Sequence, residues 1–418
     1  MKVFFDTLGC KINQYETQAM REQIIRAGGE VTEEIGLADY LILNSCVVTE
    51  TAEKASLHKL RKALRDNPGI KVVVTGCLAE LPAKSKELRL ADLICRNDEK
   101  KDLAVKLGLT EGSKELEVSG LFGHRRAFLK IEDGCENNCA YCIVPSTRGN
   151  VRSRPSAEII EEAKRLCSNG HAEIVLTGIN LGAYGKEQAK KNGLNSVVKS
   201  ILKIEKLGRL RLSSIEPEYA TQELFDIIAE SKGKVCPHLH IPLQSGDEAV
   251  LKAMNRRYNL KEYFDKIETA KKMIPGLGLT TDIIVGFPGE TDEMFENSLE
   301  FMKQQSFLKV HVFSYSDRSG TKASVMKDKI TEAEKERRYS KMLRASEVIG
   351  KEFVKGFVGK ELEILVEGIE RRKVKDIKGF SGNYIKVNIT DGNEKDIGKL
   401  VKVRLEKVEK ENYGKKAF

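Results

Sequence analysis

The stretch AFLKIEDGCENNCAYC, residues 127–142, joins an apolar strand pattern to three cysteines on one short loop. Cys135, Cys139 and Cys142 stand in C-x3-C-x2-C spacing directly after the predicted strand. Three thiolates placed in this way bind three irons of a four-iron cluster and leave the fourth iron open, unlike the four-cysteine electron carriers. An open coordination position is where a metal centre carries out chemistry. The competing interpretation is a zinc site, but it requires a fourth ligand nearby, and residues 143–166 contain no cysteine or histidine.

The sequence from residue 127 onward alternates six apolar strand patterns with helical patterns. The strand candidates lie at 128–131, 174–176, 210–212, 239–243, 279–285 and 310–313. Regular alternation of strand and helix is typical of α/β proteins with a parallel sheet. Six such units are too few to close an eightfold barrel, so the pattern predicts an open partial (β/α)6 barrel with its chemistry at the strand ends.

The first third of the chain has the same alternation of strand and helix. Apolar runs at 3–5, 40–43 and 72–74 are separated by helical patterns at about 13–27 and 49–65. This pattern predicts an N-terminal open parallel α/β domain.

Three more cysteines, Cys10, Cys46 and Cys77, each follow the end of one of these predicted strands. The carboxyl ends of parallel strands meet at one edge of a sheet, which is where ligands bind. Gly9 and Gly76 directly precede two of the cysteines and permit close approach of the backbone. We therefore expect these thiols to form one metal site. The alternative is that each is a buried small hydrophobic residue, which is a common role of free cysteine.

A charged helical pattern at 331–355 leads into short alternating runs that are typical of a small β-barrel. From Lys355 to the end, 16 Lys and Arg stand against 11 Asp and Glu, a net charge of +5. A basic β-module attached to an enzyme indicates RNA binding. Because acidic residues are interspersed, a merely solvated surface is the alternative. The runs are ELEILVEG at 361–368, NYIKVNI at 383–389 and KLVKVRLEKV at 399–408.

The composition excludes several classes of protein. A chain of 418 residues exceeds what one hydrophobic core supports and so predicts two or three domains. The sequence has no apolar run of eighteen residues and no secretory signal at its start, which predicts a cytoplasmic protein. Nine unevenly spaced cysteines are too few for a disulfide scaffold and favour metal binding or catalysis. The net charge of +9 fits a polyanionic partner, and it equally fits an excess that only keeps a protein in solution.

The C-x3-C-x2-C loop after the first barrel strand resembles the cluster loop of the radical S-adenosylmethionine (SAM) superfamily. The resemblance implies that the open iron of a [4Fe-4S] cluster binds the amino and carboxylate groups of SAM. It further implies that an electron from this cluster cleaves SAM to methionine and a 5′-deoxyadenosyl radical, which abstracts a hydrogen atom.

The same resemblance assigns contacts to SAM. Tyr141 stands where the family places an aromatic residue beside the adenine. The chain departs from the family's glycine-rich motif after the second strand, where it has Leu-Thr-Gly-Ile-Asn at 176–180. On this segment, the residues assigned to the methionyl end of SAM are Thr177, Gly178 and Asn180.

Further candidates come from strand ends and loops. Glu216, after RLSSI, is a candidate acceptor for the ribose hydroxyls of SAM, or else a surface carboxylate. Gln244 and Ser245, after HLHIPL, are candidate contacts for SAM or substrate, or else make ordinary loop hydrogen bonds. Arg148 in PSTRG carries a planar fork suited to a carboxylate or phosphate, and we count it among the cofactor-binding candidates.

Charged residues within predicted strands also need an explanation. Asp282 lies in a predicted buried strand, where a charge usually needs a partner or a function. His238 and His240 alternate along one strand, and core histidines with satisfied hydrogen bonds are the commoner outcome. The cysteines outside both triplets have apolar neighbours and are assigned no role; they are Cys95, Cys167 and Cys236.

A wider resemblance covers nearly the whole chain, because a three-cysteine N-terminal domain, a radical SAM barrel and a basic β-barrel together are similar to the radical SAM methylthiotransferase family. It implies a flavodoxin- or Rossmann-like domain at 1–115, a radical SAM core at 120–355 and a TRAM RNA-binding domain at 356–418. It also implies a second [4Fe-4S] cluster, on Cys10, Cys46 and Cys77, whose open iron holds the sulfur to be methylated and transferred. The blocks that carry it are TLGCKINQYET (7–17), LNSCVVTETAEKAS (43–56), TGCLAE (75–80), DGCENNCAYCIVPSTRGNVRSR (133–154), HLHIPLQSGDEAVLKAMNRRY (238–258) and TTDIIVGFPGET (280–291).

By this resemblance one SAM methylates the sulfur, and a second supplies the radical that removes hydrogen from C2 of an adenine in tRNA. That hydrogen has no usable acidity at neutral pH, so acid–base catalysis cannot remove it and a cofactor must. The implied partners are the anticodon stem-loop of tRNA and an electron donor such as a flavodoxin or ferredoxin, with no membrane.

The residues that flank Cys10 indicate the substrate. Members acting on isopentenyladenosine tend to have Tyr-Gly-Cys-Gln-Met-Asn, and those acting on a ribosomal protein tend to have Leu-Gly-Cys-Pro-Lys-Asn. This chain has Thr-Leu-Gly-Cys-Lys-Ile-Asn-Gln-Tyr-Glu at 7–16, which is similar to the members that modify N6-threonylcarbamoyladenosine at tRNA position 37. From a different class, the rival hypothesis is an RNA-binding iron–sulfur redox sensor without catalysis.

Overall fold

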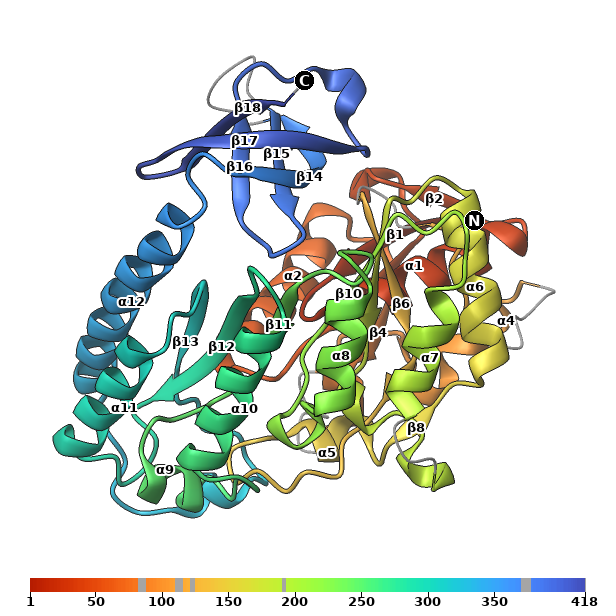
Figure 1. The fold of residues 1–418 in the computed structure, drawn as a ribbon. Coiled ribbons are helices and arrows are strands. Elements are labelled where there is room, and N and C mark those ends of the chain that lie inside the picture. The colour runs from red at the N-terminus through yellow and green to blue at the C-terminus, as the bar shows by residue number, and fades with distance from the viewer. Residues whose placement is uncertain (82–87, 110–115, 121–124, 190–192, 370–376, 418) are drawn as a thin grey trace. The chain divides into compact units, whose positions relative to one another are not determined.

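The computed structural model (Figure 1) describes residues 1–417 apart from 82–87, 110–115, 121–124, 190–192 and 370–376. Its internal contacts divide the chain into two compact units. The first unit comprises Met1–Phe122, Asp133–Val151 and Ser316–Ser324. The second unit comprises Gly123–Glu132, Arg152–Tyr315 and Val325–Phe418. Among the described residues, no helix is both long and apolar enough to cross a membrane.

The first unit is built on a five-stranded parallel sheet with the order β2-β1-β3-β4-β5. Successive residues of its central strands enter different cores: Leu41 and Leu43 pack on the side of α2, and Ile42 packs on the side of α1. The strands are therefore apolar throughout rather than alternating, as is usual for a covered parallel sheet. The strands are β1 (Lys2–Thr7), β2 (Glu30–Thr32), β3 (Tyr40–Ser45), β4 (Lys71–Gly76) and β5 (Leu93–Ile94).

The three predicted strands and two predicted helices of this unit are confirmed, whereas the short β2 and β5 carry too few residues to give a pattern. The helices are α1 (Lys11–Arg26), α2 (Glu50–Asp66), α4 (Leu103–Lys106) and α5 (Val144–Arg148), with 3-10 turns η1 (Ile35–Leu37), η2 (Cys77–Glu80) and η4 (Asn97–Asp102).

The second unit contains the six expected parallel strands, in two three-stranded sheets of order β10-β9-β6 and β11-β12-β13. Parallel bridges from Leu210 to Val235 and from Ser214 to His240 join the two sheets. The open partial barrel predicted from the sequence is therefore confirmed. The strands are β6 (Arg126–Lys130), β9 (Glu173–Thr177), β10 (Arg209–Leu212), β11 (His238–His240), β12 (Gly278–Val285) and β13 (Lys309–Ser314).

One strand of the barrel is shorter than expected. The pattern predicted a strand over 239–243, but β11 ends at His240, two residues before Pro242. Proline cannot donate a backbone hydrogen bond to the ladder, which accounts for the early end. The helices of this unit are α6 (Ser156–Ser168), α7 (Gly193–Ile201), α8 (Gln222–Glu230), α9 (Glu248–Ala253), α10 (Leu260–Met273), α11 (Asp292–Gln304) and α12 (Glu332–Lys355).

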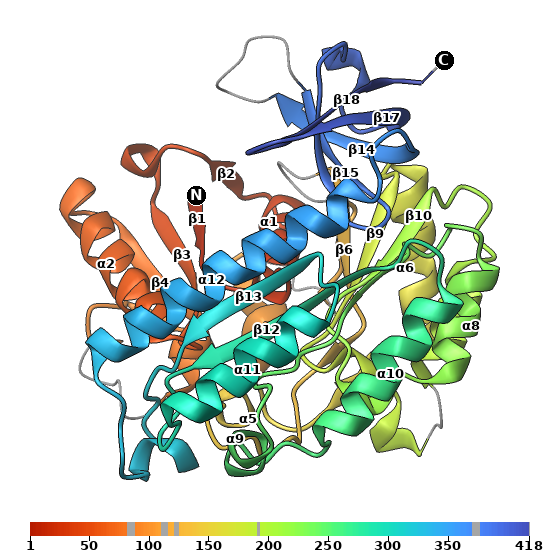
Figure 2. The same ribbon diagram turned by 60° about the vertical axis from the view of Figure 1, so that its left-hand side comes forward.

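The helix α12 packs along β13 and leads into a closed five-stranded barrel of order β14-β15-β16-β18-β17 (Figure 2). Thr331 caps α12 by accepting a hydrogen bond from the Glu334 N–H, which confirms the predicted start of this helix. Alternate residues fill the barrel, for example Ile364 and Val366 on β14. The barrel strands are β14 (Glu361–Ile369), β15 (Ile377–Ser381), β16 (Lys386–Ile389), β17 (Leu400–Val408) and β18 (Asn412–Lys416).

A buried ion cluster joins this C-terminal barrel to the partial barrel within the second unit. Glu173 at the start of β9 accepts from Arg209 Nε at 2.5 Å and from Arg211 Nε at 2.7 Å. The terminal nitrogens of the two arginines donate to backbone carbonyls of the C-terminal barrel. These carbonyls belong to Glu363, Phe380, Ser381 and Gly382, at 2.8 to 3.0 Å. We call Glu173, Arg209 and Arg211 the barrel joint.

Candidate cluster and cofactor sites

The first unit brings the N-terminal cysteine triplet together at one sheet edge. Pairing of β1 with β3 and of β3 with β4 aligns the ends of these strands, so that the residues following them are neighbours. Cys10 precedes α1, Cys46 follows β3, and Cys77 opens η2. A Cβ added at Gly9 would lie 2.9 Å from Cys46 Cβ and 3.1 Å from its Sγ. Gly9, with a φ of +105°, therefore lets the Cys10 loop pass directly against Cys46.

The three thiols are close enough to influence one another electrostatically. Burial raises the pKa of Cys46 to about 11, and the thiols of Cys77 and Cys10 add to the rise. Surrounding protein also raises the pKa of Cys10, although its side chain is accessible to solvent. Thiols of this kind ionise at neutral pH only with an electropositive partner such as a metal centre.

The donor set fits an iron–sulfur cluster. Among the described residues, no group of three Cys, His, Asp or Glu side chains is placed to hold one metal ion. A four-iron cluster takes each thiolate on a different iron, so its cysteines surround a larger volume. All three donors at this edge are soft thiolates, which suit iron–sulfur clusters.

The C-x3-C-x2-C loop lies in the same unit. The Cys135 N–H donates to Gly149 O at 3.0 Å, and the Asn137 N–H donates to Cys135 Sγ at 3.4 Å. At Gly134, with a φ of +89°, a Cβ would lie 2.0 Å from Asn150 O, so only glycine fits there. The loop is thus anchored by backbone contacts, and its three cysteine side chains are half-buried.

The expected contacts for the methionyl end of SAM lie at the end of β9 in the second unit. The Asn180 N–H donates to Glu132 Oε2 at 2.8 Å, and a Cβ at Gly178 would lie 2.5 Å from the same oxygen. Thr177 is buried in β9. The sequence analysis missed Glu132, which is fully buried, although a carboxylate at the end of a strand before the cysteine loop was visible in the sequence. Binding of SAM by these residues, and by the half-buried Tyr141 of the first unit, stays a prediction.

Glu216 and Gln244 both occupy constrained positions after barrel strands. Glu216 forms an ion pair with Arg256, while burial raises the pKa of its carboxyl group. Gln244 has a φ of +68°, and its backbone bonds to Asp282 O and Ile284 N at 2.8 and 2.9 Å fix it against β12. A non-glycine residue held in the left-handed region is common at functional sites. Contact of Glu216 and of Gln244 with SAM stays a prediction.

Asp282 has the partner that its strand position demanded. Its Oδ2 lies 3.3 Å from His240 Nε2, and Thr280 Oγ1 lies 3.0 Å from His240 Nδ1. His238 is buried, with Nε2 at 3.1 Å from the same Thr280 hydroxyl, which fits the interpretation as a core histidine. Ser245 Oγ lies 3.0 Å from Ser298 Oγ.

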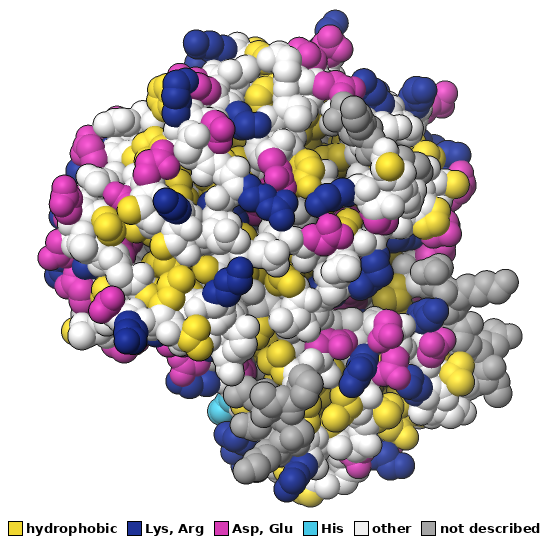
Figure 3. All heavy atoms as spheres, turned by 90° about the horizontal axis from the view of Figure 1, so that it is seen from below, with side chains coloured by type: hydrophobic (Ala, Val, Ile, Leu, Met, Phe, Trp, Pro, Cys, Tyr) yellow, Lys and Arg dark blue, Asp and Glu magenta, His cyan; other side chains and the backbone are white. Residues whose placement is uncertain are grey.

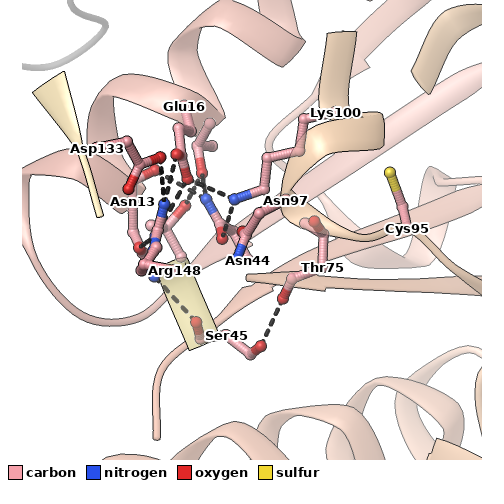
Figure 4. Close-up of polar contacts among 12 residues, drawn as sticks. Asn13, Glu16, Asn44, Ser45, Thr75, Cys95, Asn97, Lys100, Asp133 and Arg148 are labelled. Carbon is pink, nitrogen blue, oxygen red and sulfur yellow. Dashed lines mark hydrogen bonds and ion pairs between the residues drawn. The ribbon is translucent and has the colours of Figure 1, made fainter. Parts of the chain in front are cut away.

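Arg148 lies in a buried polar network of the first unit (Figure 4). Its Nη1 donates to Glu16 Oε1 at 2.6 Å and approaches Asp133 Oδ2 at 3.3 Å, and its Nη2 donates to Asn13 Oδ1 at 2.6 Å. Lys100 forms a second ion pair with Glu16. The fork was predicted to meet a carboxylate or a phosphate, and it meets the carboxylates of Glu16 and Asp133. The signal for Glu16 and Asn13 was their polarity on a helix face that the apolar pattern marks as buried.

The segment Ser316–Ser324 also contacts both cysteine loops within the first unit. Arg318 Nη1 donates to Glu53 Oε2 at 2.7 Å and to Val47 O, next to Cys46, at 3.3 Å. The Ala323 N–H donates to Ala140 O, inside the C-x3-C-x2-C loop, at 2.7 Å. The sequence analysis did not find this segment, since nothing local relates it to residues more than 180 positions away.

The three cysteines outside the triplets are buried, as expected for small hydrophobic residues; they are Cys95, Cys167 and Cys236.

Comparison with known proteins defines the class first. Residues 129–302 match the family model described as Radical SAM superfamily, and residues 2–94 match the model described as Uncharacterized protein family UPF0004. The fold resembles the radical S-adenosylmethionine methyltransferase TsrM from Kitasatospora setae, with a TM-score of 0.56, 12% identity and coverage of 78% of this chain and 77% of that chain. It also resembles the cobalamin-dependent radical enzyme OxsB, with a TM-score of 0.52, 13% identity and coverage of 84% of this chain and 56% of that chain. At these identities the likeness concerns the fold alone. The chain is a radical SAM protein.

Relatives of known activity narrow the class to a family. The chain is 37% identical to the threonylcarbamoyladenosine tRNA methylthiotransferase MtaB of Bacillus subtilis, over 96% of this chain and 93% of that protein. It is 36% identical to the protein of the same name from Thermotoga maritima, over 98% of this chain and 95% of that protein. It is also 34% identical to the tRNA-2-methylthio-N(6)-dimethylallyladenosine synthase of Alkaliphilus oremlandii, over 97% of this chain and 90% of that protein. The chain therefore belongs to the radical SAM methylthiotransferase family, and its cofactors are SAM and iron–sulfur clusters.

Proposed function

We propose that this enzyme adds a methylthio group to C2 of N6-threonylcarbamoyladenosine in the anticodon stem-loop of tRNA. The observation that carries the proposal is the presence of two separate cysteine triplets in one unit, one on the C-x3-C-x2-C loop and one at the ends of three parallel strands. A radical SAM enzyme that only cleaves SAM needs the first triplet. A second triplet supplies a place to hold the sulfur that is transferred.

The chain's own residues have distinct tasks in this proposal. Cys135, Cys139 and Cys142 hold the cluster that, together with bound SAM, supplies the radical chemistry. Cys10, Cys46 and Cys77 hold the auxiliary cluster. The residues at the ends of β9, β10 and β11 orient SAM and exclude water from the reacting carbon.

The C-terminal barrel is proposed to hold the RNA. The face of the molecule seen in Figure 3 mixes basic with acidic side chains, so the charge excess is not gathered there. The barrel segment carries over half of that excess, a net +5 of +9. An RNA complex built on phosphate contacts should weaken steeply as the salt concentration rises.

The proposal includes three functional domains, at 1–115, 120–355 and 356–418, and a cytoplasmic location where tRNA and a flavodoxin or ferredoxin donor are at hand. A second candidate substrate is N6-dimethylallyladenosine, because relatives named for it are 34% identical over most of the chain. The wording LGCKINQYE around Cys10 favours the threonylcarbamoyl substrate.

The test is mass analysis of tRNA nucleosides from a deletion strain. We expect the methylthio mark on threonylcarbamoyladenosine to disappear and to return with the wild-type gene, but not with a Cys10→Ala, Cys46→Ala, Cys77→Ala variant. Loss of the mark on dimethylallyladenosine instead would transfer the assignment to that substrate, and an unchanged profile would reject a tRNA substrate.

Iron analysis of the same variant tests the two-cluster basis directly. Anaerobically reconstituted wild type should hold about eight irons and the triple variant about four, as two four-iron clusters require. Reductive cleavage of SAM by the wild type would exclude a non-catalytic redox sensor.

A further inference from the structure

Arg148 carries a buried hydrogen-bond donor that the protein does not match. The residue is 3% exposed, and both of its terminal nitrogens are held by the chain, as Figure 4 shows. Among the residues that the structure describes, none offers an acceptor to its Nε–H. A buried donor without an acceptor is destabilising, and more so when the group is charged. A bound group that supplies an acceptor would remove this cost.

The thiols of Cys77 and Cys10 are among the groups whose charge acts on this guanidinium. Asn13 Oδ1, which accepts from Arg148 Nη2 at 2.6 Å, also accepts from Cys10 Sγ at 3.7 Å. Burial is the largest influence on the pKa of Cys10 and of Cys46 and raises both, whereas the charge of Arg148 lowers both. Arg148 therefore shares a hydrogen-bond partner with Cys10 and lies close enough for its charge to act on the thiols that would ligate the auxiliary cluster.

The charged residues that the structure describes around Arg148 balance one another and leave no positive charge over to offset that of a bound cluster. Arg148 and Lys100 balance Glu16 and Asp133, two cations against two anions. Thiolates and a cluster electron would add negative charge beyond this balance. Hydrogen bonds to the sulfurs and net charge are what set the reduction potential of an iron–sulfur cluster.

Resting on the auxiliary cluster of the proposed function, we propose that Arg148 is a positioning residue of that cluster. Its Nε–H donates a hydrogen bond to a cluster sulfur, and its fixed charge raises the reduction potential. Glu16, Asn13 and Asp133 keep the guanidinium in this orientation. Since Arg148 follows Cys142 by six residues, it also ties the chain that leaves the radical SAM loop to the site of the second cluster.

The experiment uses full-length protein carrying Cys135→Ala, Cys139→Ala and Cys142→Ala, so that all bound cluster iron belongs to the auxiliary site. The potential is measured by titration with dithionite and mediators, followed by electron paramagnetic resonance. In this parent, Arg148→Met removes the charge and the donor. We expect the equilibrium constant for reduction to fall about tenfold, a shift of about 59 mV to lower potential for one electron.

Two further variants separate the possible causes. Arg148→Lys keeps the charge and loses the Nε–H, so its potential should fall by less than that of Arg148→Met. Arg338→Met is the matched control, because Arg338 is an equally buried arginine, ion-paired with Glu290 in the second unit. Its potential should equal that of the parent.

A spectroscopic measurement on the parent, in which Arg148 is unchanged, tests the hydrogen bond directly. The parent is labelled with ¹⁵N-arginine and its cluster is reduced. Pulsed electron paramagnetic resonance should then show a coupling between ¹⁵N and the unpaired electron of the cluster, and this coupling should disappear in Arg148→Lys. This inference alone is overturned if an iron-loaded Arg148→Met variant has the same reduction potential as the parent, or if the parent shows no ¹⁵N coupling. A parent that binds no iron overturns the auxiliary site of the proposed function, and this inference with it.

Discussion

Two buried carboxylates in this protein are each ion-paired with more than one cation, and the remaining hydrogen-bond donors of those cations indicate different tasks. Glu16, 1% exposed, binds Arg148 and Lys100 beside the auxiliary cysteines. Glu173, fully buried, binds Arg209 and Arg211 at the barrel joint.

The two ion clusters differ in whether every side-chain nitrogen of their arginines has an acceptor. In the barrel joint, the Nε and both terminal nitrogens of Arg209 and Arg211 have partners within the chain. Within the described part of the chain, no acceptor meets the Nε–H of Arg148. A fully satisfied buried network rigidifies the structure, whereas an unmatched buried donor is costly unless a bound group supplies its acceptor. The first holds two barrels together, and the second serves a cofactor.

The largest expected effect comes from removing either carboxylate. Glu16→Gln and Glu173→Gln each break a buried ion pair, which costs about 3–5 kcal/mol because a charge is left uncompensated. Chemical denaturation should show similar losses in the free energy of unfolding. Iron content should separate the two: we expect Glu16→Gln to lose iron from the auxiliary site and Glu173→Gln to keep all of it. Equal iron loss in both variants would show that Glu16 and Glu173 do not differ in their roles.

A somewhat smaller effect is expected from acid. Burial alone would raise the pKa of Glu173, but Arg211 and Arg209 outweigh it and lower the pKa from 4.5 to about 2. The folded-state pKa is depressed, so this stabilisation is fully present above pH 4.5 and is lost as the pH falls towards 2. From pH 7 to pH 3 it should decline by about 2 kcal/mol at 1.36 kcal/mol per pKa unit.

Urea denaturation of wild type and Glu173→Gln at pH 7 and pH 3 isolates this contribution. The gap in unfolding free energy between the two proteins should narrow by that amount at pH 3. A constant gap would mean that the pKa of Glu173 in the folded protein is not lowered relative to the unfolded chain.

The cysteine sites could be predicted from the sequence because their geometry is local to strand ends. Parallel strands bring their carboxyl ends to one edge, so Cys10, Cys46 and Cys77 could be brought together from their positions alone. The cluster loop is contained in residues 135–142 and needs no tertiary information. The barrel strands were equally visible, except where Pro242 ends β11 early.

The buried ion clusters could not be predicted in this way. Lys100 reaches Glu16 across 84 positions, and Arg211 reaches Gly382 across 171. A sequence shows that such residues are charged, but not that they are buried or which partner compensates them. The barrel strands β15 and β18 were missed for a related reason, since IKGFS of β15 and NYGKK of β18 each contain a glycine that weakens the strand pattern.

The smallest expected change in the free energy of unfolding tests whether the barrel joint only holds the two barrels together. Tyr384 OH accepts from Arg126 Nη1 at 3.1 Å, and its ring lies beneath the guanidinium of Arg211 at 4.5 Å. Tyr384→Phe removes one hydrogen bond and should cost about 1 kcal/mol. Tyr384→Leu also removes the cation–π contacts and should cost about 0.5–2 kcal/mol more. Denaturation should rank wild type above Phe and Phe above Leu, with iron content unchanged in both variants. Iron loss in Tyr384→Phe would instead link the barrel joint to the clusters, because that substitution alters neither a thiol nor a buried charge.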